Sequence, residues 1–302
     1  MKKFLLFFAF ALALGLCATP AWAEGKAVQI SGKGGLTLNA QLSLAPGKHI
    51  KDGVVLITHG TLAHNGMQII TSMQTHLAGH GVNTLALTLN LGLGDRKGMY
   101  DCMVPHRHLY TDALDDIGAW LAWLKSQGAT KVALMGHSRG GAQTAWFAAE
   151  RPDPVVTKVI LLAPMTWNET SAREQYQARF GKSLDEPLAR ALALVKAGKG
   201  GEMMAQTDFL ACPATSVSAA AFESYYRAEP RFHTPALLPR IRVPVLVVAA
   251  SDDQLIKGLP EAVKPLADGK KVRLVTIPDA DHFFNNFAAE DAAEAVAGFL
   301  KD

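Results

Sequence analysis

Residues 131–149 have the sequence KVALMGHSRGGAQTAWFAA. The apolar run 131–135 has the length of a buried strand, and the small, apolar run 142–149 has the spacing of a buried helix. Between them, residues 136–140 fit the motif Gly-x-Ser-x-Gly, with Ser138 at its centre. Glycines on both sides of a serine remove side chains that would clash in a tight turn. The stretch therefore predicts a strand, a sharp turn that exposes the Ser138 hydroxyl, and a helix whose positive N-terminal end points toward it.

Apolar segments of strand length recur along the chain on both sides of this motif, and most are followed by a segment with helical spacing. Such alternation is typical of an α/β fold, a mostly parallel sheet covered by helices. Near the start, the glycine-rich turn 31–35 joins two segments that predict an antiparallel entry to the sheet. The predicted strands are 27–30, 36–44, 54–58, 82–89, 131–135, 155–162, 243–249 and 272–277, and the predicted helices are 67–77, 109–125, 142–149 and 288–300.

One connection between predicted strands is much longer than the others. It spans about 75 residues from Pro164 to Pro239, whereas crossovers in such folds are short. Within it, 183–196 and 219–226 have helical spacing, and the glycines of 198–201 separate them. We predict a small helical cap inserted at about residues 165–239 and keep an ordinary long connection as the alternative.

The first 23 residues have the three parts of a secretory signal peptide. Lys2 and Lys3 form a basic start, residues 4–16 are an apolar run, and Ala21-Trp22-Ala23 is a small-x-small cleavage site. An apolar run of about 13 residues is too short for a membrane-spanning helix, which needs about 20. We therefore expect residues 1–23 to be removed and no stable membrane anchor to remain.

The remaining chain, residues 24–302, is expected to form one domain and to be secreted, either periplasmic or extracellular. Cys17 raises the alternative of a lipid anchor, but the bulky Leu16 before it is unlike the small residue of a lipoprotein cleavage site. In an oxidising compartment Cys102 and Cys212 can form a disulfide. A disulfide and two free thiols are equally compatible with the sequence, because the choice depends on the distance between the two α-carbons.

The overall composition narrows the function. Of 302 residues, 49% are hydrophobic and 19% are charged, which is typical of a globular protein and excludes disordered, collagen-like and coiled-coil chains. The formal net charge is only +3, so the chain lacks the basic surface of a nucleic-acid-binding protein. The expected partner is a small molecule, and the sequence leaves the oligomeric state open.

The serine of the motif needs two further groups to act as a nucleophile. A serine hydroxyl is weakly reactive at neutral pH, so a base must take its proton and a carboxylate must orient that base. His282 is the only histidine after the last predicted strand. Two adjacent carboxylates, Asp252 and Asp253, follow the strand before it. Ser138, His282 and one of these aspartates are therefore candidates for nucleophile, base and acid.

The order serine, aspartate, histidine on alternating strands and helices resembles the α/β-hydrolase superfamily, which includes esterases, lipases, thioesterases and small peptidases. The resemblance covers nearly the whole mature chain. It implies the α/β-hydrolase fold, with helices on both faces of a mostly parallel central sheet. In this superfamily the acid stands last in a small-x-x-Asp turn. Residues 250–253 match that turn, which implies Asp253 rather than Asp252 as the acid.

The same resemblance implies an oxyanion hole. The superfamily has His-Gly after its first central strand, and residues 59–60 match it. The backbone N–H of Thr61 or its neighbour, and that of Arg139 after the nucleophile, would then bind the oxyanion.

The function implied is a serine hydrolase that cleaves an acyl bond, with a carboxylic ester as first choice. The reaction would use Ser138, His282 and Asp253 and form an acyl-enzyme intermediate. No cofactor or metal is expected, since His106 and His108 lack a matching ligand spacing or acidic cluster. The alternatives are a thioesterase or small-peptide hydrolase of the same fold, and a noncatalytic binding protein on a hydrolase scaffold. The complete set of triad residues disfavours the binding protein.

Other residues are candidates for lining the substrate site. The loop 92–108 follows a predicted strand at the edge of the sheet where active-site loops gather. Trp167, Tyr225 and Tyr226 belong to the predicted cap. They either line an apolar substrate site or pack between cap helices, and we favour packing.

Overall fold

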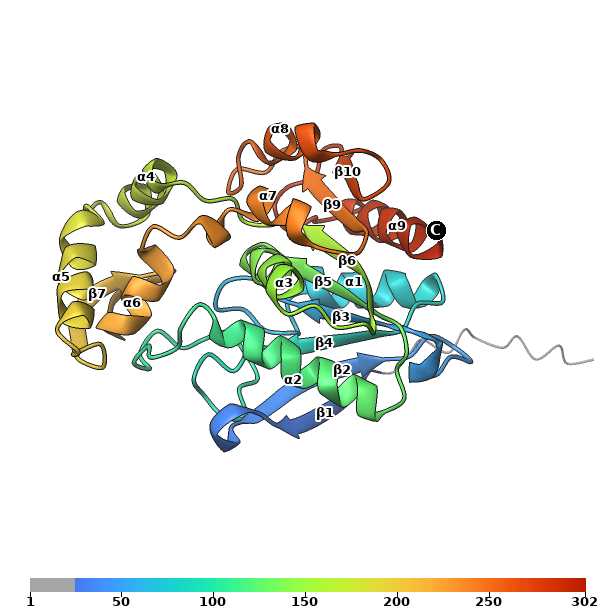
Figure 1. Ribbon diagram of the computed structural model, residues 1–302, viewed down its shortest axis with the longest axis horizontal. Helices are drawn as coiled ribbons and strands as arrows, with labels where there is room; N and C mark the ends of the chain where they lie inside the picture. Colours follow the sequence, from blue (N-terminus) through green and yellow to red (C-terminus); the bar gives the residue numbers. More distant parts are fainter. Residues whose placement is uncertain (1–24) are drawn as a thin grey trace, which may run out of the picture.

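The computed structural model describes residues 25–302 (Figure 1). The predicted signal peptide, residues 1–23, lies outside the described residues. Eight strands form one sheet in the order β1-β2-β4-β3-β5-β6-β9-β10. Strand β2 runs antiparallel to β1 and β4, and all other neighbours run parallel. The strands are β1 (Lys26–Ser31), β2 (Thr37–Ser43), β3 (Val54–Thr58), β4 (Thr84–Thr88), β5 (Val132–His137), β6 (Val156–Leu162), β9 (Val245–Ala250) and β10 (Val272–Ile277).

Side chains of the central strands alternate between two cores, one on each face of the sheet. In β3, Val54 and Leu56 belong to one core, and Val55 and Ile57 belong to the other. Successive side chains of a strand point to opposite faces, so a strand buried on both faces is apolar throughout. Helices α2 and α3 cover the first core, and α1 and α9 cover the second (Figure 1). These helices are α1 (Gln68–Gly79), α2 (Asp112–Ser126), α3 (Arg139–Glu150) and α9 (Ala288–Lys301).

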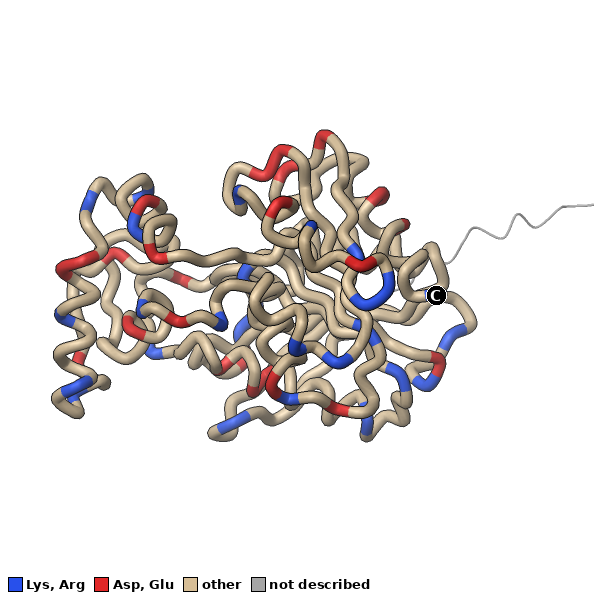
Figure 2. Tube along the Cα trace, turned by 45° about the horizontal axis from the view of Figure 1, so that its top comes forward, with Lys and Arg blue, Asp and Glu red and all other residues tan. Residues whose placement is uncertain are grey.

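The predicted fold class is confirmed, because the sheet is mostly parallel and both of its faces carry helices. Lys and Arg are interspersed with Asp and Glu along the chain rather than gathered by sign (Figure 2). Over residues 25–302, no helix is both long enough and apolar enough to cross a membrane.

The connection between β6 and β9 forms a separate group of elements at one end of the molecule, on the left in Figure 1. Two of its helices, α5 (Asp185–Lys196) and α6 (Ala219–Tyr226), lie in the segments where helical spacing predicted them. Helix α4 (Glu169–Phe180) was not predicted, because its single buried residue, Tyr176, gives it no apolar stripe. The short helix α7 (Thr234–Leu237) leads back toward β9.

The same connection also contains a β-hairpin that the sequence analysis missed. Strand β7 (Met203–Phe209) pairs antiparallel with β8 (Cys212–Ser218). Neither segment shows a regular alternation of apolar and polar residues, and the pairing contains register shifts. Strand propensity depends on the neighbours that a segment packs against, and those neighbours come from elsewhere in the chain. The cap is therefore a mixed helix and hairpin unit.

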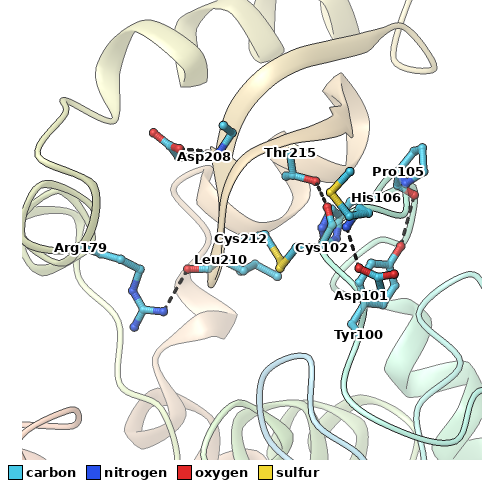
Figure 3. The surroundings of a disulfide bond; sticks show 12 residues. Tyr100, Asp101, Cys102, Pro105, His106, Arg179, Asp208, Leu210, Cys212 and Thr215 are labelled. Carbon is cyan, nitrogen blue, oxygen red and sulfur yellow. Dashed lines mark hydrogen bonds between the residues drawn. A yellow bond between two sulfur atoms is a disulfide. The ribbon is translucent and has the colours of Figure 1, made fainter.

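A disulfide and several hydrogen bonds join the loop after β4 to this hairpin. Cys102 and Cys212 form a disulfide with their α-carbons 5.3 Å apart, so the alternative of two free thiols is wrong (Figure 3). The Thr215 hydroxyl donates a 2.6 Å hydrogen bond to the carbonyl oxygen of Cys102. His106 donates its N–H to the Ser216 carbonyl, so the loop pairs along the edge of β8. One covalent bond and several hydrogen bonds thus hold the cap to the loop after β4.

Replacing both Cys102 and Cys212 with serine is expected to lower the free energy of unfolding by up to about 4.7 kcal/mol. The two cysteines are 110 residues apart in sequence, and a crosslink over such a long loop restricts the unfolded chain strongly. Urea denaturation of the wild type and the double variant measures the difference. Wild-type protein kept in reductant should unfold like the variant, and equal midpoints for oxidised wild type and variant would contradict the prediction.

Candidate active site

The candidate nucleophile lies in the turn between β5 and α3. Ser138 has φ 56° and ψ −125°, a backbone conformation that residues other than glycine rarely adopt. The turn is held on several sides: Ser138 donates its N–H to the Leu162 carbonyl, and the Ser138 carbonyl accepts the N–H groups of Ala142 and Met165. Strained residues persist only where surrounding contacts over-determine them, and they concentrate at functional sites.

The glycines of the motif are required by close backbone approach. A β-carbon on Gly140 would overlap the carbonyl oxygen of His59, and one on Gly136 would overlap the carbonyl oxygen of Gly140. The turn therefore packs directly against the end of β3. On Gly60, a β-carbon would lie 3.2 Å from the Ser138 Cβ, so the segment after β3 runs beside the nucleophile.

Ser138, His282 and Asp253 form a continuous hydrogen-bonded chain. The Ser138 Oγ lies 2.9 Å from His282 Nε2, and His282 Nδ1 lies 2.7 Å from Asp253 Oδ2. They follow β5, β10 and β9, whose carboxyl ends meet at one edge of the sheet. Because a carboxylate accepts, Nδ1 carries the imidazole proton, and Nε2 is free to accept the serine proton. All three side chains are largely shielded from water.

The structure distinguishes the two adjacent aspartates. Asp253 Oδ1 accepts the N–H groups of Leu255 and Ile256, both at 2.8 Å, and its side chain is 5% exposed. Burial alone would raise the pKa of Asp253, but the hydrogen bonds from His282 and the Ile256 N–H outweigh it and lower the pKa. Asp252 is exposed. Only Asp253 contacts His282.

A second histidine, which the sequence analysis missed, connects the turn at Ser138 to the His282 loop. The His137 ring is buried, and its Nε2 lies 2.9 Å from the His282 carbonyl oxygen. Burial, followed by the nearby His282, lowers the pKa of His137 to about 4, so the ring is neutral at neutral pH and donates its Nε2–H. The only sequence signal for His137 was its position between Gly136 and Ser138, but that position of the motif specifies no residue type.

Two buried residues, His59 and Arg96, hold the segment after β3 in place. His59 Nδ1 donates to the Gly60 carbonyl at 2.8 Å, and its Nε2 accepts the Leu89 N–H at 3.0 Å. Burial, then the charge of Arg96, lowers the pKa of His59 to about 3, which is consistent with this neutral role. Arg96 donates to the Ala63 carbonyl at 2.6 Å and to the Leu89 carbonyl at 2.7 Å. The chain beyond Gly60 is therefore held from both sides.

The two predicted oxyanion residues lie side by side. The Nε of Arg139 donates a 2.9 Å hydrogen bond to the Thr61 hydroxyl. Arg139 is the first residue of α3, so its N–H has no partner within the helix. Across residues 25–302, the backbone N–H of Thr61 also donates to no protein group. Neither backbone N–H has a protein acceptor in the described part of the chain, as the predicted oxyanion role of these two residues requires.

The histidines considered as metal ligands are part of an aromatic cluster under the cap. His106 Nδ1 lies 3.2 Å from His108 Nε2, and His108 Nδ1 lies 2.8 Å from the Tyr225 hydroxyl. Burial is the largest cause that lowers the pKa values of His106 and His108, to about 4 and about 3. The Tyr100 ring stacks on His106, with ring centroids 4.5 Å apart. This arrangement uses the imidazoles as neutral packing and hydrogen-bonding groups.

The three aromatic residues predicted in the cap all pack against other aromatic rings. Tyr226 packs inside the cap: its ring lies 4.7 Å from that of Phe222, and its hydroxyl accepts the Leu210 N–H. Trp167 packs with its ring centroid 6.1 Å from that of Phe232. Tyr225 is packed as well: it is 4% exposed, its ring lies 5.3 Å from that of Phe209, and the guanidinium carbon of Arg139 lies 5.3 Å from the centre of its ring. Packing was therefore the right prediction for all three residues.

The chain was compared with known proteins. A family model described as the alpha/beta hydrolase family matches residues 54–299. Est1E from Butyrivibrio proteoclasticus is similar at 22% identity with a TM-score of 0.63, covering 92% of this chain and 98% of that one. The esterase Pf2001 from Pyrococcus furiosus is similar at 16% identity with a TM-score of 0.60, covering 92% and 90%. The search of curated proteins found no match.

The esterase domain of a Rhodothermus marinus protein is similar at 18% identity with a TM-score of 0.57, covering 92% of this chain and 96% of that one. At such low identities, similar structures support the fold alone. The family model, in contrast, matches most of the chain. Residues 54–299 include every parallel strand, the turn at Ser138 and the loops of Asp253 and His282. The chain therefore belongs to the alpha/beta hydrolase family.

Proposed function

We propose that this protein is a serine hydrolase that cleaves a carboxylic ester through an acyl-enzyme intermediate. The observation that carries the proposal is the hydrogen-bonded chain from Ser138 through His282 to Asp253. Such a chain activates a serine, because the imidazole accepts the hydroxyl proton and the carboxylate stabilises the imidazolium that forms.

The first half-reaction begins when Ser138 Oγ attacks the ester carbonyl carbon and passes its proton to His282 Nε2. The carbonyl oxygen becomes an oxyanion, and the N–H groups of Thr61 and Arg139 bind it. Removing one such donor typically costs about 3 kcal/mol of transition-state stabilisation. His282 then gives the proton to the leaving alcohol as the carbon–oxygen bond breaks, which leaves Ser138 acylated.

In the second half-reaction a water molecule replaces the alcohol. His282 accepts a proton from water while the water oxygen attacks the acyl carbon. The bond from the acyl carbon to the Ser138 oxygen then breaks, His282 returns the proton to Ser138, and the carboxylic acid leaves. Asp253 keeps its own charge throughout and holds the His282 ring in place. The scheme balances without a cofactor or a metal ion.

The choice of ester and of compartment also belongs to this proposal. Esterases are among the proteins with similar structures, which favours an ester over a thioester or a peptide bond. The predicted signal peptide and the disulfide between Cys102 and Cys212 both favour a secreted protein, since disulfides persist in oxidising compartments. The proposed location is periplasmic or extracellular, the residues 1–23 being removed.

A fluorophosphonate probe tests the proposal before any substrate is known. Such probes phosphonylate an activated serine, so we expect the purified protein to gain one adduct, mapped by mass spectrometry to Ser138. The Ser138→Ala variant should gain none. Folded wild-type protein that stays unlabelled would reject the hydrolase and favour a noncatalytic binding protein on the same scaffold.

A further inference from the structure

The side chain of Arg139 is a cation held at the edge of the candidate site. Its backbone follows Ser138 directly, and its Nε is anchored to the Thr61 hydroxyl. The guanidinium carbon lies 5.3 Å from the ring centre of Tyr225 and 5.8 Å from that of Tyr110. Tyr225 belongs to the cap helix α6, whereas Tyr110 precedes α2. The guanidinium is therefore held between the cap and the segment that precedes α2, with a cation–π contact to each.

This cation has no counter-ion in the part of the chain that the structure describes. No Asp or Glu oxygen lies within 4.0 Å of the Arg139 nitrogens, whereas Arg231 nearby in the fold pairs with Glu229 at 2.6 Å. A guanidinium carries five N–H donors. Only the one on Nε has a protein acceptor among residues 25–302, so the four on Nη1 and Nη2 remain available. Arg139 is partly exposed, which leaves them open to a ligand.

We propose that Arg139 forms an anion subsite and that the substrate is an ester that also carries a carboxylate. This inference rests on the proposed function and adds the substrate class. The planar fork of Nη1 and Nη2 matches the two oxygens of a carboxylate and binds them in a bidentate way.

A purely structural role for Arg139 makes a different prediction. If the guanidinium only tethers Thr61, its loss disturbs the oxyanion hole and slows charged and neutral esters equally. If it binds substrate, its loss slows the charged ester more. The ratio of kcat/KM for a charged ester to that for its neutral isostere therefore separates the two roles, since the shared effect on catalysis cancels.

Two matched pairs place the charge on either side of the scissile bond. For the acyl side, p-nitrophenyl hydrogen adipate is compared with p-nitrophenyl methyl adipate. For the alcohol side, para-acetoxybenzoate is compared with para-acetoxybenzamide. In at least one pair we expect the wild type to prefer the charged ester, and Arg139→Gln to lower the charged-to-neutral ratio about 30-fold.

Further variants sharpen the test. Arg139→Lys keeps the positive charge but loses the planar fork and the bond to Thr61, so it should retain only part of the preference. Arg190→Gln removes an exposed arginine of α5 and should leave the ratio unchanged, which controls for long-range charge effects. A ratio in Arg139→Gln equal to that of the wild type for both pairs would overturn the proposal.

A binding measurement keeps this proposal separate from the proposed reaction. In the Ser138→Ala background, calorimetry compares para-acetoxybenzoate with para-acetoxybenzamide, and p-nitrophenyl hydrogen adipate with its methyl ester. If the charged member of a pair binds more tightly, and if Arg139→Gln removes this difference, the anion subsite is supported. This holds even if the wild type hydrolyses neither ester and is not labelled by the fluorophosphonate probe. Equal affinities within both pairs would overturn the subsite, while labelling of Ser138 in the wild type would leave the hydrolase proposal intact.

Discussion

Replacing Ser138 with alanine is expected to lower kcat for ester hydrolysis by about 10⁵- to 10⁶-fold. The substitution removes the atom that attacks the carbonyl, so what remains is the effect of binding and of the oxyanion donors. Initial rates on the ester that the wild type cleaves best measure the loss. The fold should persist, because the backbone hydrogen bonds of the Ser138 turn involve no side-chain oxygen. Circular dichroism and thermal unfolding check this.

The matched tests use the proposed base, His282, and a distant serine. His282→Ala should fall to nearly the same rate as Ser138→Ala, and the double variant should fall little further, because residues that act as one unit are not additive. Ser126→Ala, at the exposed end of α2, should match the wild type. Full additivity of the Ser138 and His282 losses would show that the two residues do not act together.

Replacing Asp253 with asparagine is expected to lower kcat by about 10⁴-fold. The variant is nearly isosteric, but its amide cannot supply the charge that stabilises the His282 imidazolium, and it can favour the wrong tautomer of the ring. The rate is measured on the same ester as before. The lowered pKa of Asp253 means that its carboxylate stabilises the wild-type fold at neutral pH, and that this stabilisation is lost as the pH falls through the lowered pKa. The asparagine variant should lack this stabilisation.

Asp252→Asn is the matched control, because it makes the same chemical change one residue away. Asp252 is exposed, and only Asp253 hydrogen-bonds His282, so this control should change kcat less than about twofold. A larger loss for Asp252→Asn than for Asp253→Asn would reverse the assignment of the acid.

Much of the architecture follows from local patterns in the chain. The continuous apolar runs at β3, β5 and β9 predicted strands buried on both faces, and the structure has strands there. The cap was harder. Helix α4 has no apolar stripe, and the β7–β8 hairpin has no alternation, so neither carries a local signal. Both depend on neighbours supplied by other parts of the fold.

The candidate site divides in the same way. The motif around Ser138 and the late position of His282 predicted the candidate nucleophile and the candidate base from the sequence alone. The roles of His137, His59 and Arg96 could not be predicted, because each acts through a hydrogen bond to a residue distant in sequence or to a backbone carbonyl.

By itself the sequence determined the α/β class, the sharp turn at Ser138 and the candidate residues, because strand and helix periods and glycine requirements are properties of short segments. Only the tertiary structure placed Asp253 against His282, joined Cys102 to Cys212 and, within residues 25–302, left the Arg139 guanidinium without a counter-ion. These outcomes are distances and directions between groups that lie far apart along the chain, and folding alone sets them.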